Sequence, residues 1–320
     1  MKDRWEDRTI VVTGATSGIG RATVAHLVGR GATVVAVGRR DAALRDLVEE
    51  LRGAPGRVRW HAVDVTDLDA LRAVAADAVA TGGRLDAWVN NAAVNLYGPF
   101  DAAPPEDVRR VIEVNLIGYV HGMLAALPHL RERGGGVIVN VTSVLARVPA
   151  PWQSTYVATK HAIHGLSAAV RQELHADGIK VAEVLPGPVD TPLFTQAANH
   201  MGRDVLAPDP AADPERIARA IVVAIQRPRR TRIVGLQNAM LVAMQRLSPT
   251  LTEIGAGKLM GSQQFGDAPT PASSGNLHEP DHEHATLRGG WTDRPVTLRR
   301  LAAVSLALGG LVALARSARS

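Results

Sequence analysis

A tyrosine and a lysine, Tyr156 and Lys160, stand four residues apart in a stretch whose following residues predict a helix. At that spacing both side chains share one helix face. An ammonium group beside a phenol favours the phenolate, so we expect the pKa of Tyr156 to lie below its usual value of about 10. The phenol could then exchange a proton with a substrate oxygen, and the hydroxyl of Ser143 could hold the same oxygen.

Such a pair is common, and its blander interpretation is a half-buried aromatic ring beside a solvated charge. The composition makes Lys160 more informative, because only four of the 36 basic residues are lysines: Lys2, Lys160, Lys180 and Lys258. A compact ammonium group is not interchangeable with a guanidinium group. The catalytic interpretation therefore depends on the elements around the pair.

The composition limits the classes of protein that fit this chain. With 320 residues, 46% hydrophobic and 21% charged, it is long enough for one large globular domain or two smaller ones. The net charge of +5 is not gathered into a basic block with interleaved aromatics, so we expect no nucleic-acid partner. The absence of cysteine excludes disulfides and thiolate sites. The charged start is unlike a signal peptide, so we expect a cytoplasmic location.

A glycine-rich turn follows the first predicted strand, Thr9 to Thr13, and leads into an apolar helical pattern. Glycines let such a turn bring backbone N–H groups against a pyrophosphate, and the helix start adds a partial positive charge. A tight structural turn is the alternative. The next predicted strand, Thr33 to Val37, completes a β-α-β unit of the expected length. The turn, with Gly14, Gly18 and Gly20, predicts a nucleotide phosphate site.

Two arginines, Arg39 and Arg40, stand at the end of the second strand, where an NAD-specific fold usually carries an acidic residue. An arginine there can pair with a 2′-phosphate, which favours NADP(H) over NAD(H). A solvated pair of arginines is the alternative. The third predicted strand, Arg57 to Val65, contains Asp64, whose carboxylate could reach an adenine amino group.

Further strands are predicted at Asp86 to Asn90, Val137 to Val141, Ile179 to Leu185 and Thr231 to Gly235. Their alternation with helices predicts an α/β, Rossmann-type doubly wound parallel sheet of about seven strands, with helices on both faces. Asn90 lies at the ligand edge of such a sheet, although asparagines there often only cap turns. Asn115 falls within an apolar helix, so it needs a buried partner and its catalytic interpretation depends on its neighbours.

Together these motifs resemble the short-chain dehydrogenases/reductases from about Thr9 to Gly235. The resemblance is carried by Thr13-Gly14-x-x-x-Gly18-x-Gly20, Asn90-Asn91-Ala92, Asn115, Ser143, Tyr156-x-x-x-Lys160 and Pro186-Gly187. It implies that Tyr156 is the general acid/base and that Ser143 orients the carbonyl. It also implies that Lys160 binds the nicotinamide ribose and that Asn115 positions a water in a proton relay.

The resemblance also implies that Gly14, Ser17, Gly18, Ile19 and Gly20 cradle the pyrophosphate, and it adds cofactor-binding residues beyond this turn. Asp64 and Val65 would flank the adenine, and Asn90 would lie near the adenosine ribose. One departure is Ala93, where the family usually has glycine. After the sixth strand the implied cofactor residues are Pro186, Gly187, Val189 and Thr191, the last two at the carboxamide.

Substrate selection is predicted from the same family geometry. An apolar mouth beside the nicotinamide would suit a small hydrophobic carbonyl or alcohol. Residues Thr191 to Asp209 look like a cover over the substrate, with ordinary surface packing as the alternative. The family also suggests a homodimer or homotetramer through the helices that carry Asn115 and Tyr156. The predicted pocket residues are Leu145, Trp152, Leu193 and Phe194, with Val148 and Met201 beside them.

The predicted function is an NADP(H)-preferring oxidoreductase that interconverts a carbonyl and an alcohol by hydride transfer, with Tyr156 as general acid/base. One alternative is a non-catalytic nucleotide sensor or scaffold that kept the fold. The presence of Ser143, Tyr156 and Lys160 argues against it, because a sensor needs no proton relay. A sugar-nucleotide epimerase or dehydratase is a third hypothesis, which the glycine spacing and the short substrate segment disfavour.

Four segments are expected: a dinucleotide-binding catalytic domain over 1–236, a helical extension over 237–264, a flexible linker over 265–295 and a hydrophobic Arg-flanked helix over 296–320. The linker is rich in Gly, Pro, Ser and Asp. Its histidines, His278, His282 and His284, have no fixed spacing, so we expect no metal site.

The apolar stretch Leu301 to Ala315 would extend only about 22 Å as a helix, short of the roughly 30 Å hydrocarbon layer. Membrane-surface association is one interpretation of the segment. Packing on the body or on a second subunit, and disorder, stay open.

Overall fold

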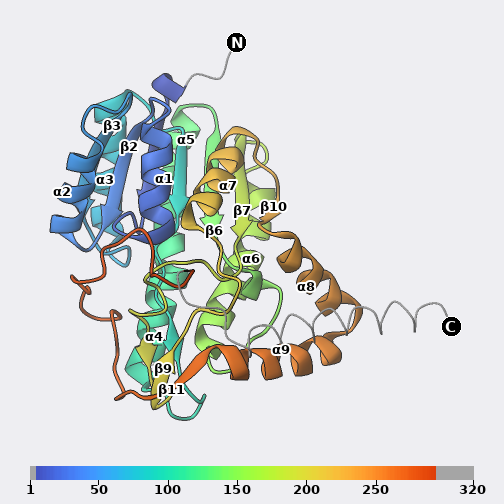
Figure 1. The fold of residues 1–320 in the computed structure, drawn as a ribbon. Helices are drawn as coiled ribbons and strands as arrows, with labels where there is room; N and C mark the ends of the chain where they lie inside the picture. Colours follow the sequence, from blue (N-terminus) through green and yellow to red (C-terminus); the bar gives the residue numbers. More distant parts are fainter. Residues whose placement is uncertain (1–4, 293–320) are drawn as a thin grey trace.

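The computed structural model describes residues 5–292. Its centre is a seven-stranded sheet in the order β10-β7-β6-β4-β1-β2-β3, and every pairing in it is parallel (Figure 1). The Rossmann-type prediction is confirmed. The strands are β1 (Thr9–Thr13), β2 (Thr33–Gly38), β3 (Arg57–Ala62), β4 (Ala87–Asn90), β6 (Gly136–Val141), β7 (Ile179–Leu185) and β10 (Thr231–Ile233).

Helices cover both faces of this sheet, so its central strands are buried throughout. All residues of β1 and β4 are buried, as expected for parallel strands that are covered on both faces. One hydrophobic cluster joins the sheet to α1 (Gly18–Val28), α2 (Asp41–Glu50) and α7 (Pro214–Gln226). The cluster on the opposite face includes α3 (Leu68–Gly82), α4 (Pro105–Ile112), α5 (Gly118–Glu132) and α6 (Ser154–Glu173).

The predicted long helix is interrupted by one π-helical turn, Glu113–Ile117, between α4 and α5. Such turns loosen the regular ladder of backbone hydrogen bonds and are frequent at functional sites. Within residues 5–292, the run Pro105–Glu132 is the one helix long and apolar enough to cross a membrane. Half of its most apolar window is buried inside the protein, as in a core helix of a globular domain.

The parallel register brings the carboxyl ends of β1, β2, β4 and β6 to one edge of the sheet. Val12 lies beside Ala36 and Val89, and Val89 lies beside Val139. The turns after these strands therefore meet at this edge, where open α/β sheets bind ligands.

Beyond the sheet, the chain continues into two helices, α8 (Leu236–Leu247) and α9 (Pro249–Gln263), in the segment predicted as a helical extension. Pro249 sits at the start of α9, where its missing N–H costs nothing. Two small sheets pair β5 (Leu96–Tyr97) with β8 (Ala198–Asn199), and β9 (Arg203–Val205) with β11 (Phe265–Pro269). Short 3-10 turns lie at Trp5–Asp7 and Val144–Ala146.

The segment predicted as a flexible linker differs from that expectation. As far as residue 292 it is strand β11 followed by a loop that packs on the body (Figure 1). Its polar composition hides three well-spaced anchors, Phe265, Leu277 and Trp291, all of which are buried. The average composition of a segment does not reveal a few single apolar side chains that are buried. The predicted helix over 296–320 lies outside the described residues.

Candidate active site

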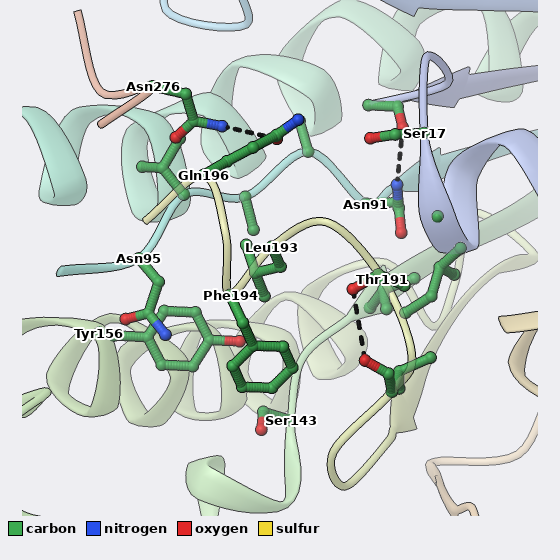
Figure 2. A pocket seen from close by; sticks show the side chains of 18 of the residues that line it. Ser17, Asn91, Asn95, Ser143, Tyr156, Thr191, Leu193, Phe194, Gln196 and Asn276 are labelled. Carbon is green, nitrogen blue, oxygen red and sulfur yellow. Dashed lines mark hydrogen bonds between the residues drawn. The ribbon is translucent and has the colours of Figure 1, made fainter. Parts of the chain in front are cut away.

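A cavity of about 250 Å³ lies at the carboxyl edge of the sheet. Figure 2 shows Tyr156, Ser143 and Phe194 gathered on one side of it, with Ser17 and Asn91 across from them. The structure therefore brings most of the predicted site residues to one cleft. Those that line it are Gly14, Ser17, Gly18, Ile19, Arg39, Arg40, Asp64, Val65, Ser143, Leu145, Tyr156, Lys160, Pro186, Gly187, Val189, Thr191, Leu193 and Phe194.

Tyr156 and Lys160 lie on the buried face of α6. Tyr156 is 7% exposed and Lys160 only 1%. The ammonium nitrogen of Lys160 lies 5.3 Å from the centre of the Tyr156 ring. It donates hydrogen bonds to the carbonyl oxygen of Val141 at 3.2 Å and to the hydroxyl of Tyr119 at 3.4 Å. The shared helix face is as predicted, but the ammonium group faces the end of β6.

The expected direction of the Tyr156 pKa is wrong for this cleft. Burial raises the pKa of Tyr156 to about 12, and a hydrogen bond with Ser143 only partly opposes the rise. Burial also lowers the pKa of Lys160 to about 7. Removing two groups from water disfavours the charged form of each. Tyr156 is therefore a neutral phenol at neutral pH, ready to donate a proton.

Ser143 follows β6 directly and begins the 3-10 turn Val144–Ala146. Its side-chain oxygen accepts a hydrogen bond from the backbone N–H of Leu145 at 3.1 Å, which fixes the hydroxyl. The same hydroxyl interacts with Tyr156. Ser143 and Tyr156 can thus contact one substrate oxygen together.

Tyr119 does not line the cavity, but it is a buried partner of Lys160 that the sequence analysis missed. Its hydroxyl donates to the carbonyl of Val141 at 2.7 Å, and its ring centre lies 5.1 Å from the Lys160 nitrogen. Burial raises its pKa well above the usual value, so it stays neutral. The available signal was its position four residues after Asn115 on a predicted helix.

Asn115 lies in the π-helical turn and is fully buried. Its amide oxygen accepts from the N–H of Val94 at 2.9 Å, and its amide nitrogen donates to the Val94 carbonyl at 2.9 Å. A longer contact, 3.4 Å, reaches the Thr159 hydroxyl. The side chain therefore holds the segment after β4 against α6, and it is not among the residues that line the cavity.

The glycine turn has the backbone that its sequence predicts. Gly14 and Gly18 have φ angles of +65° and +51°, in the left-handed region that favours glycine. A Cβ on Gly20 would lie 2.0 Å from the Gly14 carbonyl oxygen, so Gly20 allows close packing beneath the turn and does not line the cavity. The turn leads into the N-terminus of α1, a position that attracts anions.

Arg39 and Arg40 lie beside this turn at the end of β2. Arg40 donates to the hydroxyls of Thr16 at 2.6 Å and Ser17 at 3.0 Å. Arg39 donates to backbone carbonyls of the C-terminal loop, including that of Leu277 at 3.1 Å. Burial lowers the pKa of both guanidinium groups, which are partly withdrawn from water. Thr16 is a further cavity residue that the sequence analysis did not single out.

Asp64 and Val65 line the cleft next to these arginines. Burial opposes ionisation of Asp64, but hydrogen bonds from Thr66 and Arg110 outweigh it and lower the pKa of the carboxyl. The Thr66 hydroxyl lies 2.9 Å from one Asp64 oxygen, and Arg110 forms an ion pair with the other. Asp64 is therefore a fixed, ionised acceptor at this end.

The structure places Asn90 differently from the prediction. Its side chain accepts from the Trp88 indole N–H at 2.8 Å and donates to the Asn140 amide oxygen at 2.9 Å, within the core. Asn91 lines the cleft instead and donates to the Thr13 carbonyl at 2.9 Å. Side chains alternate between the two faces along a strand, so Asn90 and its neighbour Asn91 point to opposite sides.

Trp152 is also not among the residues that line the cavity. Its ring packs edge-on against Phe265 at 5.5 Å, beneath β11. The prediction missed this partner because it assigned residues 265–295 to a linker. Met260 and Gln264, from the end of α9, line the substrate end instead.

The residues present fit a dinucleotide. A Cβ on Gly14 would lie 2.7 Å from the Ala92 Cα, so the turn must remain a bare backbone cradle. Guanidinium groups stand at one end of the cleft and a buried phenol at the other. Within residues 5–292 no cluster of three or more His, Cys, Asp or Glu side chains is suited to hold a metal ion.

Comparison with known proteins agrees with this geometry. The family model described as short chain dehydrogenase matches residues 8–202. An uncharacterized oxidoreductase of Bacillus subtilis, YxnA, is 33% identical over 98% of this chain and 91% of its own length. A Mycobacterium paratuberculosis short chain dehydrogenase bound to NAD has a TM-score of 0.66 at 30% identity, covering 74% of this chain and 99% of its own.

A Burkholderia cenocepacia short chain dehydrogenase in complex with NADP has a TM-score of 0.67 at 26% identity, covering 79% of this chain and 98% of its own. Similar folds thus hold either nicotinamide dinucleotide. The choice between the two has to be argued from the residues of this chain.

Proposed function

The chain belongs to the short-chain dehydrogenase family, oxidoreductases that act on CH–OH groups with NAD(P), and we propose that it is an NADP(H)-preferring carbonyl reductase for small hydrophobic ketones or aldehydes. The observation that carries the proposal is one cleft with a guanidinium pair at one end and a buried, neutral phenol at the other.

A nicotinamide held at the Tyr156 end would supply a hydride to the carbonyl carbon. Tyr156 donates its proton to the carbonyl oxygen, so the substrate gains one hydride and one proton and becomes an alcohol. Ser143 holds the oxygen during the transfer. Lys160, in its ammonium form, stabilises the phenolate that the transfer leaves behind. The same steps in reverse oxidise an alcohol.

The preference for NADP(H) follows from charge at the end of β2. Arg39 and Arg40 provide several N–H donors there, and guanidinium groups bind phosphates in paired geometry. Both Arg39 and Arg40 line the cleft. No acidic side chain stands at either position to hold ribose hydroxyls, as an NAD-specific site would usually have.

The substrate end is mostly apolar. Leu145, Leu193 and Phe194 line it together with Met260, and Phe194 packs edge-on against Trp291. Such a wall suits a hydrophobic body, while Ser143 and Tyr156 supply the polar contacts that orient the carbonyl.

A homodimer or homotetramer through α6, which carries Tyr156, and the helical run from α4 to α5, which carries Asn115, is part of the proposal. Ile112, Ile117 and Leu124 are large apolar side chains exposed along this helical run, at 39%, 38% and 46%. We propose that they pack against a second copy in the cytoplasm. Light scattering after gel filtration should give a multiple of the 33.9 kDa chain mass, and a Leu124→Glu variant should shift it towards the monomer.

The proposal is tested by mixing the purified protein with NADPH or NADH and a panel of ketones and aldehydes. Loss of nicotinamide absorbance with apolar ketones, faster with NADPH than with NADH, is the expected result. Tight NADPH binding with no turnover on any carbonyl would instead favour the non-catalytic nucleotide sensor. Equal rates with both cofactors would contradict the NADP(H) preference.

A further inference from the structure

The C-terminal loop, residues 273–291, crosses the cofactor cleft and touches it on both sides; we call it the strap. It leaves β11 beside the substrate end, where the backbones of Ser273 and Asn199 exchange hydrogen bonds of 3.0 and 2.8 Å. Asn276 then bonds to Gln196 through its backbone N–H at 2.9 Å and its side chain at 3.0 Å. Figure 1 shows this segment, in red, returning across the edge of the sheet.

On the adenosine side, the strap occupies the cationic groups. Arg39 donates to the carbonyls of Leu277 and His278 at 3.1 and 3.3 Å, and Arg40 donates to that of Asp281 at 2.8 Å. Neutral carbonyls are weaker partners for a guanidinium group than a phosphate is. An arginine has five N–H donors, so strap contacts and phosphate contacts are compatible.

The strap next reaches the glycine turn and then the substrate side again. The N–H of Gly18 donates to the Thr286 carbonyl at 3.0 Å. Further on, the backbone N–H groups of Gly289 and Trp291 donate to one carboxylate oxygen of Asp190 at 3.0 and 2.8 Å. Asp190 is fully buried, so its side-chain oxygens need these donors as hydrogen-bond partners.

The cavity persists beneath the strap. Asn276, Pro280 and Asp281 line it together with residues of the glycine turn and the end of β2. Its volume of about 250 Å³ is below the roughly 300–1,000 Å³ of ordinary small-molecule sites, and a dinucleotide is larger than most such ligands. The strap therefore forms part of the wall of the cleft and narrows the space left for a dinucleotide.

Two features hold the strap down at its adenosine end. Leu277 is fully buried in the hydrophobic cluster that also contains Val111 and Val94. The fully buried carboxylate of Asp107, on α4, lies 2.9 Å from the ring nitrogen of His278 and 3.0 Å from the Ser274 hydroxyl.

Asp107 also binds the substrate side. Its third contact is with His200, which follows β8, at 2.9 Å. One buried carboxylate thus joins the strap to the loop that carries the substrate wall. The sequence analysis did not single out Asp107, and Asp107 does not line the cavity.

We propose that the strap is a gate for dinucleotide exchange, closed by the Leu277 anchor and by the Asp107 carboxylate, so that nucleotide enters and leaves only when these contacts open. This inference rests on dinucleotide binding in the cleft and not on the carbonyl substrate. It assigns Asp107 as a positioning residue that acts through the strap.

Nucleotide release measures the gate directly. Bound NADPH is displaced in a stopped-flow instrument by excess NADP⁺, which does not fluoresce, and the loss of bound-NADPH fluorescence gives the release rate. Release should be about tenfold faster in both Leu277→Ala and Asp107→Asn. Matched controls are Leu247→Ala, at a leucine that is 86% exposed, and Glu106→Gln, at the exposed neighbour of Asp107. Both controls should release NADPH at the wild-type rate, and thermal melts should establish that each variant is folded.

A covalent staple gives the opposite test. Because the chain has no cysteine, a Gln196→Cys/Asn276→Cys double variant can form only one intramolecular disulfide. The oxidised form should bind and release NADPH about tenfold more slowly than the same protein after reduction.

Equal exchange rates in the oxidised and reduced staple, with unchanged release in the anchor variants, would overturn the gate. Faster association with unchanged release would also overturn it, because the strap would then compete with the nucleotide and not enclose it. If NADH binds and NADPH does not, the cofactor preference under the proposed function is wrong and the same measurements with NADH still decide the gate. Binding of neither dinucleotide would refute both.

Discussion

The reaction end of the cleft holds Ser143, Tyr156 and Lys160, and its proposed phosphate end holds Arg39 and Arg40. These two ends are assembled from very different stretches of the chain. Ser143, Tyr156 and Lys160 come from one strand end and the helix that follows it. Arg39, in contrast, meets the carbonyl of Leu277, which is 238 residues later in the sequence. Local spacing predicts the first arrangement, whereas only the folded chain reveals the second.

The two ends also use charge differently. At the reaction end, burial determines which form of Tyr156 and Lys160 is present, so protonation is the variable. At the phosphate end the arginines stay charged, and what changes is whether they donate hydrogen bonds to strap carbonyls or to a phosphate. Four predictions separate the two ends, from the largest expected effect to the smallest.

Removing the Ser143 hydroxyl should affect only the reaction end. A Ser143→Ala variant should lose about 100- to 1,000-fold in kcat for carbonyl reduction, because the substrate oxygen loses a fixed donor. NADPH affinity, measured by fluorescence titration, should stay within about twofold of wild type. Ser154→Ala, at an exposed serine at the start of α6, is the matched control. A comparable loss of NADPH affinity in Ser143→Ala would contradict the division between the ends.

Removing the arginines should affect only the phosphate end. An Arg39→Ala/Arg40→Ala variant should bind NADPH about 10- to 100-fold more weakly, since charge-assisted hydrogen bonds to the phosphate are lost. NADH affinity should change far less, as isothermal titration would measure. Arg45→Ala, whose side chain on α2 is 67% exposed in an ion pair with Asp41, is the control. Equal losses for the two nucleotides would undo the assigned role.

The pH profile should report Lys160. Its pKa is lowered to about 7, so the ammonium is present below that pH and lost above it. Since the ammonium stabilises the phenolate that Tyr156 becomes, kcat/KM for reduction should fall by about tenfold per pH unit at higher pH. In a Lys160→Met variant the rate should be lower and this limb absent. A wild-type rate that is flat from pH 6 to about 9 would count against the role.

Asn90 should affect neither end. An Asn90→Ala variant leaves the Trp88 N–H and the Asn140 amide without their buried partner, which should cost about 1–3 kcal/mol in the free energy of unfolding. Urea denaturation measures that loss. NADPH affinity should remain within about twofold, in contrast to the prediction from the sequence. If the variant lost more free energy of NADPH binding than free energy of unfolding, Asn90 would belong to the cofactor site.

Much of this cleft is predictable from the sequence because its parts follow short-range rules. The glycine turn needs left-handed φ angles at Gly14 and Gly18, and a four-residue spacing puts Tyr156 and Lys160 on one helix face. Alternating strands and helices predict the parallel sheet, and its register brings these parts to one edge.

The remaining features depend on burial and on contacts between distant parts of the chain, which the spacing of residues in the sequence does not report. The direction of the Tyr156 pKa is set by burial, which outweighs the opposing hydrogen bond with Ser143. Which side of the sheet the Asn90 side chain faces depends on how side chains alternate along β4. The strap depends on single anchors such as Leu277 within a polar stretch, and its partner Asp107 gives no local signal at all.

The central claim, that one cleft holds the dinucleotide and protonates a carbonyl through Tyr156, is tested most directly by a single turnover. The NADPH complex of wild type and of Tyr156→Phe is mixed with a reducible apolar ketone, and loss of nicotinamide absorbance is followed in time. We predict that the variant binds NADPH as tightly as wild type but transfers hydride about 100- to 10,000-fold more slowly. Hydride transfer at the wild-type rate in Tyr156→Phe would contradict the account.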